Sequence, residues 1–141
     1  MRIVVCIVAL MCVSTAALAA NPTPLDFTQV LIGINGKPIT QPSPDCKSSE
    51  VGGKDCPLVD VTLSDVAIGA LEASLDEDRT ADIKKKFARG MLAQDIYRKK
   101  QIVLSPDDVS LIKDRIGKSY STAVVVAAWP LLDPTLTTDN K

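Results

Sequence analysis

The side chains of this sequence that could do chemistry are mainly carboxylates, because histidine does not occur among its 141 residues. Histidine-based acid–base catalysis and most transition-metal sites are therefore excluded. Two acidic clusters stand out, Asp76-Glu77-Asp78 and Asp107-Asp108. The first begins like a calcium-binding loop, but Ala81 stands at its sixth position, where such loops need glycine. We interpret the first cluster as a solvated turn between helices and the second as helix-capping residues.

Sequence motifs of the common enzyme classes are absent as well. The chain contains no G-x-S-x-G nucleophile elbow, no P-loop and no dinucleotide-binding fingerprint. We expect no catalytic, cofactor-binding or metal-ligating residue, no cofactor, and no enzymatic activity. A carboxylate-dependent cell-wall hydrolase remains the alternative, with Asp76 and Glu77 as its candidate residues, although no pair of carboxylates is marked out for glycoside cleavage.

Four cysteines are present, and two of them, Cys6 and Cys12, lie in an apolar leader at the start of the chain. Cys46 and Cys56 remain, ten positions apart in a stretch rich in Pro, Ser, Gly and Lys. A closed zinc site needs four ligands, which this chain lacks, and a redox motif usually has only two residues between its cysteines. In an exported protein, the spacing predicts a disulfide between Cys46 and Cys56 that closes a surface loop.

The leader has the three parts of a secretory signal: basic Arg2, an apolar run, and small residues up to Ala20. Signal peptidase accepts such small residues, so we expect cleavage after Ala19 or Ala20 and a periplasmic or secreted protein. Two alternatives stay open: the segment remains as an anchor, since a span needs about 20 apolar residues, or translation begins downstream.

Charge gives a further constraint on partners. Loss of Arg2 leaves 15 basic and 17 acidic side chains, a net charge of −2. The mature chain has no electrostatic reason to bind nucleic acid. The one basic cluster, Lys84-Lys85-Lys86 with Arg89, is interpreted as a solvated helix face. We expect a protein partner, and no membrane contact after the signal is removed.

The N-terminal third of the mature chain has the pattern of short strands. Residues 27–34 are β-branched and aromatic, and Asn35-Gly36 predicts a type I′ hairpin turn after them. The return strand should be short, because Pro38 has no amide donor. Residues 40–57 are expected to form a loop, and alternating polarity predicts another half-buried strand over 58–63.

Two helices are predicted next. Ser64 should cap the first, whose inner face would carry Ile68, Leu71 and Leu75. Thr80 should cap the second, which runs to Lys99 with Asp82–Lys86 and Asp95–Lys99 pairs on its wet side. The apolar residues expected to face inward from this second helix are Ile83, Phe87, Met91, Leu92 and Ile96.

The clearest local signal is a helix start at Ser105-Pro106, with Ser105 as cap, Pro106 in the first turn, and a staple between Leu104 and Val109. Val109, Ile112 and Ile116 form its buried stripe, and Gly117 is expected to end it. Residues 120–132 predict a buried helix that Pro130 ends or kinks, with Tyr120 and Trp129 in the core. Residues 133–141 predict a flexible tail.

The segments Val61-Thr62-Leu63-Ser64-Asp65-Val66 and Ile116-Gly117-Lys118-Ser119-Tyr120, together with the N-G hairpin and a late tryptophan, resemble a group of small phage and prophage proteins of unknown function. The resemblance covers about residues 27–132 and implies helical structure near Trp129. It implies no catalytic residue, and the leader and the cysteine-closed loop depart from the group's pattern.

Together these observations predict an α+β fold, a small antiparallel hairpin or sheet from the N-terminal third packed on three to four helices. We expect a signal peptide over 1–20, one domain over 21–132 and a tail over 133–141. The expected function is a non-catalytic protein-interaction domain of the cell envelope, and the resemblance implies a phage or prophage origin. The alternatives are the hydrolase described above and a virion-associated structural protein, for which the leader would be spurious.

Overall fold

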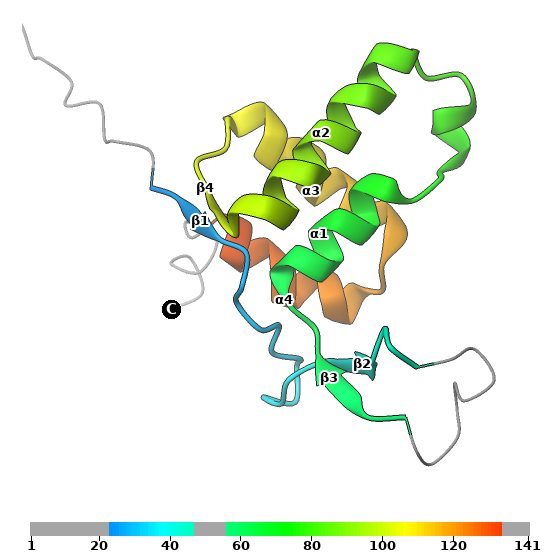
Figure 1. Ribbon diagram of the computed structural model, residues 1–141. Helices are drawn as coiled ribbons and strands as arrows, with labels where there is room; N and C mark the ends of the chain where they lie inside the picture. The colour runs from blue at the N-terminus through cyan, green and yellow to red at the C-terminus, as the bar shows by residue number, and fades with distance from the viewer. Residues whose placement is uncertain (1–22, 47–55, 134–141) are drawn as a thin grey trace, which may run out of the picture.

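The chain folds into four α-helices and two small antiparallel sheets, as the computed structural model shows for residues 23–46 and 56–133. This arrangement is the predicted α+β fold. In Figure 1, α1 lies among the other helices and the β2–β3 sheet lies at the opposite end of the molecule from the start of α2. The predicted cleavage site at Ala19 and Ala20 and the tail beyond Asp133 lie outside the described residues. No helix within the described ranges is long and apolar enough to cross a bilayer.

The hairpin over residues 30–39 is more irregular than predicted. In place of two full strands, only isolated bridges form, between Ile32 and Pro38 and between Val30 and Thr62. The turn is also not type I′, because that turn needs two residues with positive φ. Gly36 has a φ of 73°, whereas Lys100 is the only non-glycine residue of the described chain with positive φ. Asn35 instead accepts a hydrogen bond from the Lys37 amide at 3.0 Å.

The predicted strand over residues 58–63 is shorter than expected, because only residues 58–60 are strand and Leu63 already begins a helix. β2 (Thr40–Pro42) pairs antiparallel with β3 (Leu58–Asp60), although residues 40–42 were expected to be loop. The predicted alternation continues past β3, since Val61 and Leu63 are buried and Leu58 is 65% exposed. Beyond the sheet, Cys46 and Cys56 lie at disulfide distance, with their Cα atoms 6.0 Å apart.

The second sheet was not predicted, because its strands are only two residues long. β1 (Leu25–Asp26) pairs with β4 (Gln101–Ile102), which lies between two helices in the sequence. The Phe27 amide then donates to the Lys100 carbonyl at 2.8 Å. This pairing fastens the N-terminal segment to the end of α2.

Helix α1 (Leu63–Glu72) begins two residues earlier than predicted. Its cap is Thr62, whose hydroxyl accepts from the Asp65 amide, while the Asp65 carboxylate accepts from the Thr62 amide at 2.8 Å. This reciprocal capping box satisfies two amides, which the predicted Ser64 cap could not do. Ser64 is buried, and its amide donates to the Phe27 carbonyl.

Helix α2 (Ile83–Lys99) begins after the Asp82 cap, and not after Thr80 as predicted. Its inner face was only half identified. Ala93 and Ile96 are buried, whereas Ile83 is 78%, Phe87 70% and Met91 45% exposed. The apolar residues of the first half of α2 therefore point away from the core.

Helix α3 (Pro106–Ser119) starts as predicted, because the Ser105 hydroxyl accepts from the Asp108 amide at 3.1 Å and Pro106 occupies the first turn. Gly117 does not end it. A β-carbon at Gly117 would lie 3.6 Å from the Trp129 ring, an ordinary van der Waals contact. The helix ends at Ser119, and the amide of the C-cap residue Tyr120 donates to the Ile116 carbonyl.

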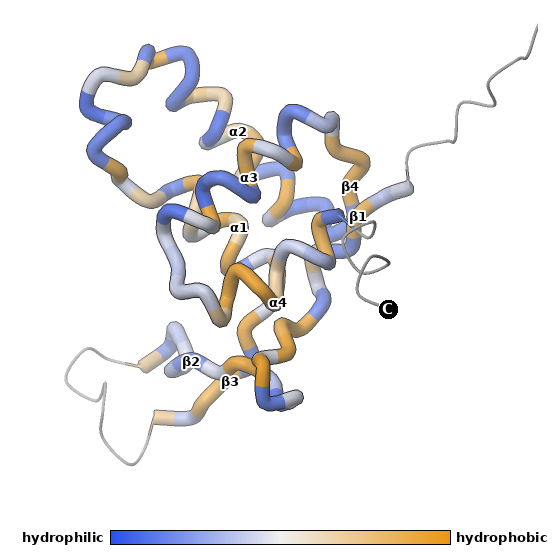
Figure 2. Tube along the Cα trace, turned by 180° about the vertical axis from the view of Figure 1, so that it is seen from behind, coloured by the Kyte–Doolittle hydropathy of each residue, from blue (hydrophilic) through white to orange (hydrophobic). Residues whose placement is uncertain are grey.

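Helix α4 (Thr122–Leu132) confirms the predicted helix, but only Ala128 and Leu132 of it are buried, and Pro130 lies inside it and does not end it. Pro130 is in the last turn, so few later residues depend on the helical bonding that it disturbs. Trp129 and Tyr120 pack against the core as predicted. Figure 2 shows that α4 is largely hydrophobic, whereas the turn between α1 and α2 is largely hydrophilic.

The core lies where α1 meets the other helices and the N-terminal segment. Helices α2 and α3 both pack mainly on α1. The buried apolar residues are Phe27, Leu31, Val61, Leu63, Val66, Ala67, Ala70, Leu71, Ala93, Ile96, Ile112, Ile116, Ala128 and Leu132. Helices α2 and α3 both contact α1, and a cavity lies between them.

Candidate functional site

The polar feature at the centre of the helices is the side chain of Arg115, which is 1% exposed. It reaches from α3 to the end of α1, where Nε donates to the Ala70 carbonyl at 3.2 Å and Nη2 donates to the Ala73 carbonyl. Helix C-termini carry unpaired carbonyls and partial negative charge. The last turn of α1 has no basic residue of its own. Arg115 supplies the missing cation from another helix.

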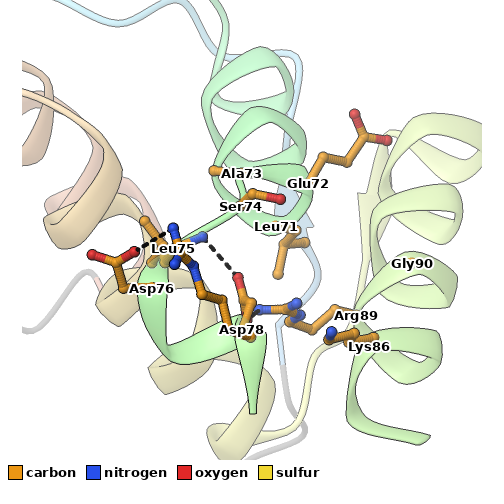
Figure 3. Close-up of a pocket in the computed structure, with 11 residues that line it drawn as sticks. Leu71, Glu72, Ala73, Ser74, Leu75, Asp76, Asp78, Lys86, Arg89 and Gly90 are labelled. Atoms are coloured by element: carbon orange, nitrogen blue, oxygen red, sulfur yellow. Dashed lines mark hydrogen bonds and ion pairs between the residues drawn. The ribbon is translucent and has the colours of Figure 1, made fainter. Parts of the chain in front are cut away.

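Asp78 is the anionic partner of this arginine. It lies in the short 3₁₀ helix η1 (Asp76–Arg79), and its Oδ2 accepts from Arg115 Nη2 at 2.9 Å while Oδ1 accepts from Nη1 at 3.2 Å. The same carboxylate accepts from the Leu75 amide and from Arg89 of α2. Figure 3 shows the Asp78 and Arg89 side chains meeting between η1 and α2. One carboxylate thus joins α2, α3 and η1.

The electrostatics of this cluster keep Asp78 ionised. Hydrogen bonds from Arg115, then from the Leu75 amide, hold the pKa of Asp78 well below its ordinary value despite its burial. A carboxylate with so low a pKa carries no proton at neutral pH, so it cannot act as a general acid. Asp78 therefore has a structural role, because its hydrogen bonds hold η1 against α3 and the end of α1.

The other two carboxylates of the first acidic cluster are paired as well. Glu77 accepts from Lys118 at 2.9 Å and from Arg115 at 3.4 Å. The hydrogen bonds of Lys118, first to Asp114 and then to Glu77, raise the pKa of its amine. Asp76 is almost fully exposed and lies 3.5 Å from Arg79. The predicted solvated turn is therefore correct for Asp76 and Glu77 but wrong for Asp78, which is buried.

Two cavities lie on either side of the Asp78–Arg89 contact. One, of about 490 Å³, lies between the end of α1 and α2 and is the space drawn in Figure 3. The other, of about 660 Å³, lies between α2 and α3 and is named here the α2–α3 groove. Its lining residues are Glu77, Asp78, Thr80, Ala81, Asp82, Lys85, Ala88, Arg89, Leu92, Asp108, Leu111, Asp114 and Arg115.

The α2–α3 groove combines an apolar wall with charged rims. Ala88 and Leu92 of α2 face it from one side and Leu111 of α3 from the other. Asp108 and Asp114 line the α3 side, while Lys85 lines the α2 side. Asp108 is already used as a hydrogen-bond partner of Ser105, at 2.6 Å. Such a groove between two helices has the form that receives an amphipathic helix or an extended peptide.

Helix α1 and the residue after α3 approach each other closely at Gly69 and Tyr120. A β-carbon at Gly69 would lie 2.3 Å from the Tyr120 hydroxyl, so only glycine fits there without displacing the ring. Burial raises the pKa of the Tyr120 phenol, and the Asp65 carboxylate raises it further. The phenol therefore stays protonated at neutral pH. Both residues lie in or next to the sequence segments that carry the phage-protein resemblance.

Sequence reasoning missed the two arginines of the cluster. Arg89 was assigned to a solvated face, but its side chain is only 15% exposed because it turns inward to Asp78. Lys84, Lys85 and Lys86 are exposed as expected. Arg115 gave one signal that could have been used, since it lies three positions after Ile112 and one before Ile116, on the buried stripe of α3. A charged residue at a core-facing position needs a buried partner.

Within residues 23–46 and 56–133, no cluster of three or more Cys, Asp or Glu side chains could hold a metal ion. Comparison of the chain with protein-family models, with curated proteins and with solved structures finds no match. The resemblance to phage proteins therefore stays a prediction, and the function has to be argued from the site itself.

Proposed function

We propose that this protein is an exported, non-catalytic protein-interaction domain of the cell envelope, and that its partner binds in the α2–α3 groove. The observation that carries the proposal is the groove itself: a space of about 660 Å³ with apolar Ala88, Leu92 and Leu111 between charged rims. Interaction sites of this kind bind through a buried apolar centre and gain specificity from polar edges.

The state of the carboxylates supports a binding role over hydrolysis. A carboxylate hydrolase needs one carboxyl group that holds a proton near neutral pH. Asp78 is held ionised by arginines, Glu77 pairs with Lys118, and Asp76 is an exposed partner of Arg79. Turnover of peptidoglycan that is lost in Asp76→Ala or Glu77→Ala would favour the hydrolase instead.

The export part of the proposal rests on the leader and on the cysteine pair. Cys46 and Cys56 lie at disulfide distance, and disulfides persist in oxidising compartments such as the periplasm and the extracellular space. Intact mass of the native protein tests both parts at once, since it reports the first residue and whether the two thiols are oxidised. A protein that begins at Met1 with free thiols would contradict export.

The interaction is tested by pull-down from a periplasmic fraction with a blocked groove. Ala88→Arg places a long side chain on the groove wall, at an exposed helical position where arginine is well tolerated. Gln94→Arg is the matched control, because Gln94 is exposed on the same helix and does not line the groove. We expect a partner that is lost with Ala88→Arg and retained with Gln94→Arg. Absence of a reproducible partner, or equal recovery by both variants, would contradict the proposal.

A further inference from the structure

Helix α2 has a second apolar side that nothing in the described chain covers. Ile83, Phe87 and Met91 recur every four residues, so they form one stripe on the helix. They are 78%, 70% and 45% exposed, and they line neither of the two cavities beside α2. At 1.5 Å per residue the stripe is about 12 Å long. We name Ile83, Phe87 and Met91 the outer stripe.

Helix α2, with Lys100 after it, is strongly basic, although Arg89 turns inward to Asp78. Residues 83–100 contain seven basic side chains and one acidic side chain, a net charge of +6. The whole chain carries −1, so the rest of it carries −7. Helical geometry places Lys84 on one side of the stripe and Lys86 on the other, and both are exposed. A binding partner for this surface should be apolar at its centre and anionic around it.

From these observations we propose that the outer stripe of α2 docks on the surface of an anionic lipid bilayer. An interfacial helix inserts an apolar side into the headgroup boundary while lysines beside it reach the lipid phosphates. A nucleic acid would neutralise the lysines but would leave the apolar side chains unpaired. A second copy of the same helix would bring like charges together. The outer side of a single helix is convex, which a soft bilayer surface accommodates.

The position of α2 agrees with this orientation. Ile83 and Phe87 lie on the side of the helix opposite Arg89 and Leu92, which face the interior and the groove. Figure 1 shows the start of α2 at the edge of the molecule, away from the β2–β3 sheet. A domain lying on a bilayer through the outer stripe keeps the α2–α3 groove open. The proposal therefore goes beyond the protein-binding function and departs from the sequence-based expectation of no membrane contact.

The test uses the full chain with a tryptophan introduced at one position. Phe87→Trp places the reporter in the outer stripe, and Ile34→Trp places it at an equally exposed site on the distant hairpin, where Ile34 is 78% exposed. Both variants keep Trp129, so their difference reports the introduced side chain. Vesicles contain brominated phosphatidylcholine, alone or in equimolar mixture with phosphatidylglycerol. Bromine quenches only a tryptophan that enters the bilayer boundary, so the readout is specific to position 87 even if the leader also binds lipid.

We expect a blue shift and quenching for Phe87→Trp in the anionic vesicles, and neither for Ile34→Trp. Adding Lys84→Gln and Lys86→Gln should raise the lipid concentration needed for half-maximal quenching about thirtyfold, because each lysine near an anionic surface contributes about fivefold. Quenching that is absent at position 87, equal at position 34, or equal without phosphatidylglycerol would overturn the proposal. If Phe87→Trp shows no quenching and Phe87→Ser loses a soluble protein partner, the outer stripe binds a protein instead. The Ala88→Arg pull-down is read separately, so either proposal can fail alone.

Discussion

Replacement of Arg115 by methionine tests the central physical claim about the fold, that one buried cation joins α1, η1 and α3. Methionine keeps most of the length and apolar contact of the arginine stem but removes all five hydrogen bonds to carbonyls and carboxylates. The Asp78 carboxylate then stays buried with Arg89 as its remaining cation, and the last carbonyls of α1 lose their donor. Breaking a buried ion pair from one side typically costs about 3–5 kcal/mol.

For a domain of this size, that cost lowers the melting temperature by about 10–20 °C. Thermal and urea unfolding followed by circular dichroism measure it. Arg79→Met is the matched control, because Arg79 is 83% exposed and its pair with Asp76 should contribute less than about 1 kcal/mol. In the Arg115→Met background, Asp78→Asn should destabilise less than it does alone, because the two residues share one interaction. A melting temperature that falls no further for Arg115→Met than for Arg79→Met would refute the reasoning.

Four further predictions concern other parts of the chain. Gly69→Ala should destabilise the protein by about 1–3 kcal/mol, because the new methyl group displaces the Tyr120 hydroxyl. In a Tyr120→Phe background, which lacks that hydroxyl, the cost should shrink or reverse. Equal costs in both backgrounds would contradict the contact. Because the pKa of Asp78 is lower in the folded than in the unfolded chain, its stabilisation is present above about pH 4 and is lost as pH falls through the folded pKa. In urea titrations, the free energy of unfolding should therefore fall less steeply towards acid pH for Asp78→Asn than for the surface control Asp107→Asn. Gly36→Ala should cost about 1–2 kcal/mol, since φ is 73° and a β-carbon there meets open space, and Gly36→Asn should cost less; equal denaturation midpoints for the parent and Gly36→Ala would exclude strain at this turn. Reduction of the Cys46–Cys56 pair should lower the free energy of unfolding by about 2.5–3 kcal/mol, and a midpoint unchanged by reductant would mean that no bond constrains the loop.

The sequence alone determined the features that depend on a few neighbouring residues. The start of α3 follows from Ser105 and Pro106, because a cap needs only a side-chain oxygen within reach of amides two or three positions on. The alternation around Val59 and Val61 follows from the two-residue period of a strand. The proximity of Cys46 and Cys56 was predictable because short loops close easily.

Only the tertiary structure decided which of several locally acceptable arrangements is used. Helix α2 has apolar residues on two sides, and contact with α1 selects Ala93 and Ile96 for the core while Phe87 stays outside. Local spacing cannot express that choice, because it depends on how far α2 extends beyond α1. Arg115 is buried because the end of α1, more than forty residues earlier, offers it carbonyl acceptors. Such long-range electrostatic pairing leaves no pattern among neighbouring residues, so the fold had to bring the partners together before the site could be recognised.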